Sequence, residues 1–189
     1  MAQQTPSLAP HSMPVHDSVA VFAPATVANL GVGFDILGMA LDAPGDIVHA
    51  TYREQPGAAL TSISGDGGHL PRAAGRNPAC IAAQITLERL GASGGVSLRL
   101  EKGLPLASGL GSSAASAAAA AVAVNELFGA PLGRDDLLAA CVEAEASVSG
   151  RHADNVAPAL WGGIVLVMSA EGRAVYPLPI PDELVLALV

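Results

Sequence analysis

The segment SGLGSS, from Ser108 to Ser113, places two glycines and three serines directly before a run of alanines. Alanine is the best helix former, so the run predicts a helix that begins here and ends near Gly129 and Pro131. The first N–H groups of a helix lack partners, and the helix dipole makes this end positive. Glycine lets an anion approach the backbone, and serine adds hydroxyl donors or metal ligands. The motif predicts a phosphate site, with a ligand-free helix start as the alternative.

Three other interpretations of this segment fail. A Walker A loop requires lysine where Ser112 stands. Gly109, Gly111 and Ala114 fit the GxGxxA dinucleotide fingerprint, but eight residues, Glu101–Ser108, separate the first glycine from the preceding predicted strand. The purely apolar run that follows is about a dozen residues, which is shorter than the roughly 20 needed to span a membrane.

Glu145 is a candidate functional carboxylate. In the helix predicted over Asp135–Ser149, it shares the apolar face with Leu138 and Cys141, whereas Glu143 points almost the opposite way. A carboxylate on a buried face is costly unless it is paired or bound to a metal. The pattern leaves two interpretations of Glu145 open: a Mg²⁺ ligand, or a half-exposed glutamate near a helix end.

The elements that must position these groups can be predicted from periodicity and punctuation. Asn77 as N-cap, Pro78 in the first turn and Gly91 as the stop predict a helix. A glycine-rich loop is expected over Ala23–Gly38. Apolar or alternating runs predict strands at Val19–Phe22, Asp46–Tyr52, Val96–Leu100, Gly162–Met168 and Leu184–Val189.

Composition excludes several classes of function. Half of the 189 residues are apolar, which indicates a globular core, and a net charge of −8 without a basic run argues against nucleic-acid binding. Cys80 and Cys141 are far apart in apolar contexts, so we expect reduced core residues rather than a disulfide or zinc site. The polar, proline-rich segment 1–17 lacks the features of a secretory signal, and we expect a flexible tail on a cytoplasmic protein without membrane attachment.

Three stretches resemble one kinase family. Gly103–Ser116, GLPLASGLGSSAAS, resembles the phosphate-binding motif of the GHMP kinases. Pro24–Asp42 and Val148–Gly163, which contains HADN, resemble the homoserine kinases within that superfamily. The resemblance implies an α+β fold: an N-terminal domain like ribosomal protein S5 domain 2 with a left-handed βαβ crossover, followed by a ferredoxin-like domain. It implies transfer of the γ-phosphate of ATP to the hydroxyl of L-homoserine, with Mg²⁺, in threonine biosynthesis.

The resemblance also assigns residues. Ser113 and Glu145 would hold Mg²⁺, and with Asn155 they form the expected catalytic set. Asn29, Asp35, His152 and Asn155 would bind the substrate. The expected ATP-binding residues are Asn77, Lys102, Pro105, Leu106, Ala107, Ser108, Gly109, Leu110, Gly111, Ser112, Ser113 and Ala114.

Some of these residues have simpler interpretations. Asn77 is a strong N-cap, and the resemblance places the same segment in the adenine pocket. Lys102 has the pattern of a solvated surface lysine, which the family uses to help hold the nucleotide. Asn155 stands where mevalonate-type relatives have an aspartate base, and an amide accepts no proton. The implied mechanism is direct attack of the substrate hydroxyl without a side-chain base. A serine hydrolase would need a GxSxG motif, which is absent.

The domain expectation is a tail at 1–17, an ATP-binding domain at 18–180 and the start of a second domain at 181–189. The chain stops within the apolar run that includes Leu184, so we expect the front part of a longer protein, inactive or nearly so alone. The family's carboxylate-binding arginines have no match here. Alternatives are a mevalonate- or shikimate-type GHMP kinase, or a non-catalytic nucleotide-binding short form. The family is often dimeric, so a homodimer is an expectation from the resemblance alone.

Overall fold

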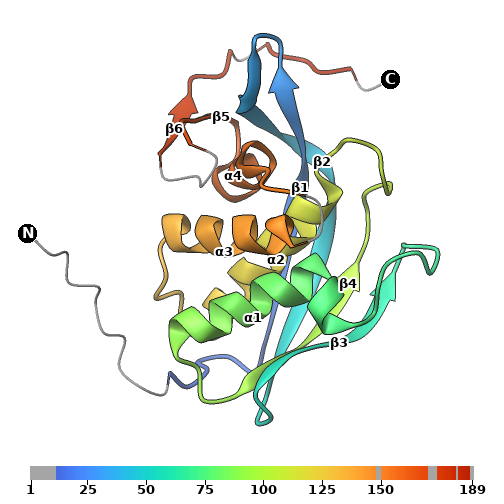
Figure 1. Cartoon of the computed structure of the whole chain (residues 1–189), viewed down its shortest axis with the longest axis vertical. Helices are drawn as coiled ribbons and strands as arrows, with labels where there is room; N and C mark the ends of the chain where they lie inside the picture. The colour runs from blue at the N-terminus through green and yellow to red at the C-terminus, as the bar shows by residue number, and fades with distance from the viewer. Residues whose placement is uncertain (1–11, 148–149, 170–173, 182, 188–189) are drawn as a thin grey trace, which may run out of the picture.

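Four α-helices pack together on one side of a six-stranded mixed sheet in the part of the chain that the structure describes (Figure 1). The computed structural model describes residues 12–147, 150–169, 174–181 and 183–187. The strand order is β3-β4-β2-β5-β6, with β1 paired to β2. The strands are β1 (Ser18–Leu30), β2 (Gly33–Arg53), β3 (Gly57–Ser64), β4 (Gly95–Glu101), β5 (Ile164–Val167) and β6 (Val175–Leu178). The helices are α1 (Pro78–Leu90), α2 (Ser112–Leu127), α3 (Arg134–Ala146) and α4 (Ala153–Trp161), with a short 3-10 turn at Ala74–Arg76.

The glycine-rich loop predicted over Ala23–Gly38 is wrong, because β1 and β2 continue through this segment as a long hairpin. The strands meet where Leu30 pairs with Gly33, and two register shifts accommodate the irregular sequence of β1. Gly38 lies inside β2 for a steric reason: a Cβ there would lie 1.8 Å from the backbone oxygen of Asp154. The absence of a side chain at Gly38 therefore permits close contact between β2 and α4, and this glycine does not indicate a loop.

Strand β3, helix α1 and strand β4 form a βαβ unit with parallel strands. Helix α1 is confirmed: the Asn77 side chain accepts a hydrogen bond from the Ala79 N–H, and Gly91 ends the helix in the left-handed conformation. The sequence analysis did not predict β3. The architecture confirms the expected α+β fold, and the left-handed crossover stays a prediction.

Helix α2 is buried between two hydrophobic clusters. Ala118 and Ala119 belong to the cluster formed with the sheet and α1. Ala117 and Ala121 belong to the cluster with α3, α4 and β5. Alanine on all sides allows close approach, so the alanine run reflects a helix enclosed by protein.

The flexible tail expected over residues 1–17 stays a prediction, and the C-terminal end of the described chain differs from the predicted strand. Backbone N–H of Val15 donates to the Leu127 carbonyl at the end of α2, at 2.8 Å. Residues 184–187 form no strand, so the strand predicted over Leu184–Val189 is wrong for this part, and 188–189 lie outside the described residues. Helix α3 ends at Ala146, and 148–149 also lie outside the description. Among the described helices none is long and apolar enough to cross a membrane.

Candidate active site

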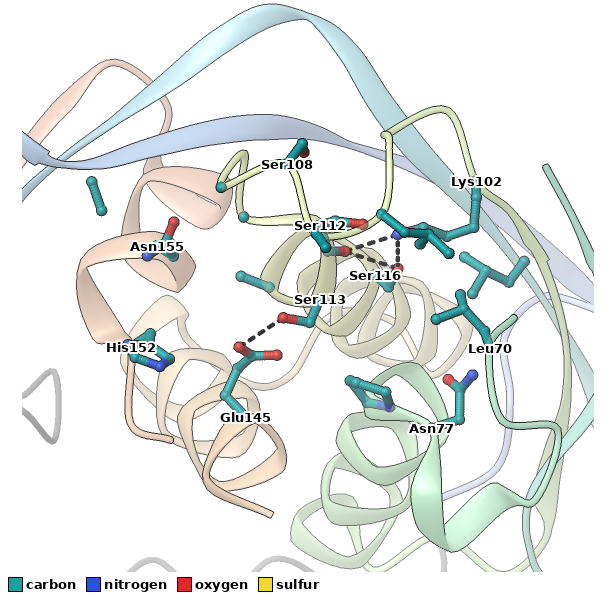
Figure 2. A pocket seen from close by; sticks show the side chains of 18 of the residues that line it. Leu70, Asn77, Lys102, Ser108, Ser112, Ser113, Ser116, Glu145, His152 and Asn155 are labelled. Atoms are coloured by element: carbon teal, nitrogen blue, oxygen red, sulfur yellow. Dashed lines mark hydrogen bonds between the residues drawn. The ribbon is translucent and has the colours of Figure 1, made fainter. Parts of the chain in front are cut away.

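A cavity of about 470 Å³ opens where the β4–α2 loop (residues 102–111) meets the first turns of α1, α2 and α4 and the end of α3 (Figure 2). It contains most of the predicted site residues. Its lining is Ala28, Asn29, Leu70, Asn77, Pro78, Leu100, Lys102, Leu106, Ala107, Ser108, Gly109, Gly111, Ser112, Ser113, Ala114, Ser116, Glu145, His152 and Asn155.

The first turn of α2 is arranged to bind an anion. Gly111 is its N-cap, in the left-handed conformation with φ +62°, and no side chain caps the helix. A Cβ at Gly111 would lie 2.0 Å from Thr26 Oγ1, so only glycine fits. Because Ser112, Ser113 and Ala114 line the cavity, the uncapped end of the helix faces it. Helix N-termini of this kind attract phosphate.

Ser113 and Glu145 form an oxygen pair beside this helix start. Ser113 Oγ donates to Glu145 Oε2 at 2.9 Å, and Glu145 is only 2% exposed although it carries a carboxylate. Glu143 lies on the other face of α3, with its side chain 62% exposed near Arg89. The predicted orientation of the two glutamates is therefore confirmed.

The Ser113–Glu145 pair fits Mg²⁺ in chemistry and number. Mg²⁺ prefers oxygen ligands and binds through one or two protein groups together with phosphates and water. No group of three or more His, Cys, Asp or Glu side chains among the described residues could hold a metal. A Mg²⁺ ion held by this pair would take its remaining ligands from a bound phosphate and from water.

Lys102 is not a solvated surface side chain, since its side chain is 1% exposed. Its Nζ contacts Asp46 Oδ2 and donates to the Ser112 carbonyl and to Ser116 Oγ, both at 2.9 Å. Burial lowers the pKa of the Lys102 ammonium, and the carboxylates of Asp46 and Glu145 oppose that shift.

Asn155 and His152 approach the cavity from the first turn of α4. Thr26 Oγ1 donates to Asn155 Oδ1 at 3.1 Å, which leaves the amide NH₂ of Asn155 as the donor for other groups. Figure 2 shows the Ser113–Glu145 pair between these α4 residues and Asn77. Side chains predicted for the substrate (Asn155, His152), for the metal (Ser113, Glu145) and for the nucleotide (Asn77) therefore line one cavity in that spatial order.

Asn29 and Asp35 lie at the tip of the β1–β2 hairpin. Both have left-handed backbone conformations, with φ +59° and +60°. The Asp35 N–H donates to Asn29 Oδ1 at 3.0 Å, so Asn29 also stabilises the turn. Asn29 lines the cavity, whereas Asp35 is exposed and outside the lining.

Pro105 and Leu110, predicted to bind ATP, do not line the cavity but shape the loop. The Pro105 carbonyl accepts from Ser108 Oγ at 2.9 Å, and the Leu110 carbonyl accepts from the Thr26 N–H at 3.1 Å. Sequence reasoning missed several residues at the site. They are Thr26, Ala28, Asp46, Leu70, Pro78, Leu100 and Ser116.

Asp154 is a further buried carboxylate, to which the sequence analysis assigned no role at the site. It is 3% exposed, and its Oδ2 has no hydrogen-bond partner among the described residues. Burial raises its pKa; Asp35 adds to this effect, and His152 counteracts it.

The chain is similar in sequence to known kinases. The family profile described as "GHMP kinases N terminal domain" matches residues 77–163. Homoserine kinase of Arabidopsis thaliana is 54% identical over 176 residues, which cover 90% of this chain and 47% of that protein. Homoserine kinase of Chlorobium phaeobacteroides strain BS1 is 44% identical over 183 residues, covering 91% of this chain and 57% of that protein.

Solved structures give the same result. The crystal structure of homoserine kinase from Cytophaga hutchinsonii has a TM-score of 0.84 and 48% identity, and the match covers 89% of this chain and 54% of that one. The Methanococcus jannaschii mevalonate kinase, at 17% identity and a TM-score of 0.66, shares the fold. The chain spans about half the length of the curated relatives it matches. Residues 77–163 therefore resemble the N-terminal domain of the GHMP kinases, and homoserine kinases are similar to the chain over about 90% of its length.

Proposed function

We propose that this chain provides the ATP-binding part of a kinase that phosphorylates the hydroxyl of L-homoserine to give O-phospho-L-homoserine. One observation carries the proposal: the uncapped start of α2 and the Ser113–Glu145 pair line the same cavity as Asn155. Phosphoryl transfer depends on positioning and charge stabilisation, which are the properties that these groups supply.

Backbone donors would bind the phosphates. Apart from Lys102 and His152, the described lining contains no basic side chain, and Lys102 is already paired with Asp46. The N–H groups of the loop and of the first turn of α2 are then the donors for phosphate oxygens. The nucleoside would extend toward Leu70 and Asn77, on the opposite side from α4.

Ser113 and Glu145 would hold Mg²⁺, which neutralises charge on the transferring phosphoryl group when bound. Asn155 would orient the homoserine hydroxyl through its NH₂ group, because its Oδ1 is engaged by Thr26. The hydroxyl oxygen attacks the γ-phosphorus, the bond to the β–γ bridging oxygen breaks, and ADP leaves. Since Asn155 accepts no proton, the hydroxyl proton passes to a phosphate oxygen or to water.

Binding and turnover test this proposal separately. Equilibrium dialysis of the chain with ATP, with and without Mg²⁺, should show binding that Mg²⁺ strengthens. ³¹P NMR of the protein made from the whole reading frame, incubated with ATP and homoserine, should show a new phosphate ester. Mevalonate and shikimate serve as competing substrates.

Phosphorylation of mevalonate or shikimate without homoserine would replace the proposed substrate by one of the alternatives. Nucleotide binding without turnover of any of the three would favour a non-catalytic nucleotide-binding protein.

A further inference from the structure

Asp46 is a fully buried carboxylate to which the proposed reaction assigns no role. It lies on β2, and it contacts the start of the β4–α2 loop and the second turn of α2. Its Oδ1 accepts from the N–H groups of Gly103 and Leu104, at 3.1 and 3.3 Å. Its Oδ2 accepts from Ser116 Oγ at 2.6 Å and contacts Lys102 Nζ.

Lys102 completes the connection across the loop. An ammonium has three N–H donors, and the three of Lys102 match its three partners: Asp46, the Ser112 carbonyl and Ser116 Oγ. Ser112 is the first residue of α2, whereas Gly103 and Leu104 begin the loop. Figure 2 shows Lys102 reaching Ser112 and Ser116 beside the first turn of α2.

The network therefore fixes the start of the loop and the start of α2 relative to one buried carboxylate. Lys102 is not an available cation for phosphate, since its donors are used within the protein. Donors that are held in position before a ligand binds give tighter binding and better catalysis, because no reorganisation is needed.

We infer that Asp46, Lys102 and Ser116 are positioning residues that hold the β4–α2 loop in its phosphate-binding conformation, and that Lys102 acts through the loop rather than as a phosphate ligand. This inference rests on the proposed function, because it assumes that the loop binds phosphates. It adds that the affinity for nucleotide depends on a carboxylate that does not line the cavity.

Three variants of the full chain test it. Ser116→Ala removes one member and leaves the charge pair intact. Asp46→Asn leaves Lys102 without its counter-charge, and the double variant Asp46→Asn/Lys102→Met removes both charges and avoids a buried unpaired one. Thr86→Ala is the matched control for Ser116→Ala: Thr86 is also buried in a helix and donates to the backbone at Ala82, away from the loop.

Two measurements are made on each variant: amide hydrogen exchange of residues 103–111 without nucleotide, and the Kd for ATP with Mg²⁺. We expect faster exchange in Ser116→Ala and in the double variant, with a Kd raised about tenfold or more in the double variant. Thr86→Ala should leave both values unchanged. Asp46→Asn should weaken ATP binding. If Lys102 instead bound phosphate directly, its release from Asp46 would leave the affinity for ATP unchanged or raise it.

Unchanged exchange and Kd in Ser116→Ala and in the double variant would overturn the inference, as would tighter binding in Asp46→Asn. If Asp46→Asn does not fold, the other two variants decide. If the wild-type chain binds no ATP, the proposed function fails, and the exchange data still show whether the network holds the loop.

Discussion

The two ends of the cavity are built in opposite ways. At the start of α2, side chains that touch the loop are buried and hydrogen-bonded, as Asp46 and Lys102 show. At the tip of the β1–β2 hairpin, Val32 is fully exposed and Phe34 is 69% exposed. Asp35 lies between apolar neighbours at this exposed tip.

Under the proposed function, this difference separates the side of the cavity that binds nucleotide from the side that binds the second substrate. The nucleotide side is organised by the protein core, so its geometry is fixed before binding. The hairpin side positions Asn29 and Asp35 by a local turn alone, within the described residues. Substitutions at the start of α2 should therefore alter nucleotide binding and stability together. Substitutions at the tip of the hairpin should alter the binding of the second substrate alone.

The largest expected effect is that of Glu145→Gln. It removes the carboxylate charge from the Ser113–Glu145 pair, so turnover should fall by about 10²-fold or more, and Mg²⁺ should no longer strengthen ATP binding. Steady-state kinetics and equilibrium dialysis measure the two effects. Glu143→Gln, on the exposed face of the same helix, is the matched control. Equal losses in both variants would refute the assignment of Glu145.

Gly111→Ala should produce the next largest effect. Its Cβ would collide with Thr26 Oγ1, and its φ of +62° disfavours any side chain. We expect a lower Tm and ATP affinity reduced about tenfold or more. Gly109→Ala has a similar φ of +74° but open space around its Cβ, and it should do less. Equal effects would show that conformation alone, without the Thr26 contact, limits this position.

Asp35→Asn tests the hairpin end. If Asp35 faces the substrate ammonium group, its loss should raise the KM for homoserine about tenfold and leave the Kd for ATP unchanged. Asp42→Asn, at another exposed position of β2, should change neither value. A change in the Kd for ATP would contradict the separation of the two ends.

The smallest effect concerns Asp154 and depends on pH. Its pKa is raised in the folded protein, so as pH rises the unfolded chain ionises first and the folded state loses stability. Asp154→Asn should therefore have a higher Tm than the wild type at pH 7. The difference should disappear near pH 3, below the ordinary carboxyl pKa of about 3.9. A lower Tm for the variant at pH 7 would contradict a raised pKa.

The features that the sequence predicts correctly are set by residues close together in the chain. The cap and stop of α1, the start of α2 and the buried face of Glu145 each depend on residues within a few turns of one another. The sequence analysis missed the hairpin because its glycines are typical of a loop. Its register shifts also interrupt the regular alternation that marks a strand, and they become visible only once the strand pairing is known. The sequence analysis missed Asp46 because it is 56 residues from Lys102 in the chain. No sequence pattern around Asp46 identifies it as the partner of that lysine.

The alanines of α2 have a consequence for how the molecule unfolds. Since one helix contributes side chains to both hydrophobic clusters, neither cluster can loosen without exposing a face of α2. The two clusters should therefore melt as one cooperative unit. A nucleotide bound at the first turn of this helix would then protect the remote ends of both clusters from opening, although it would contact the clusters only near the cavity, at Leu100 and Ala114.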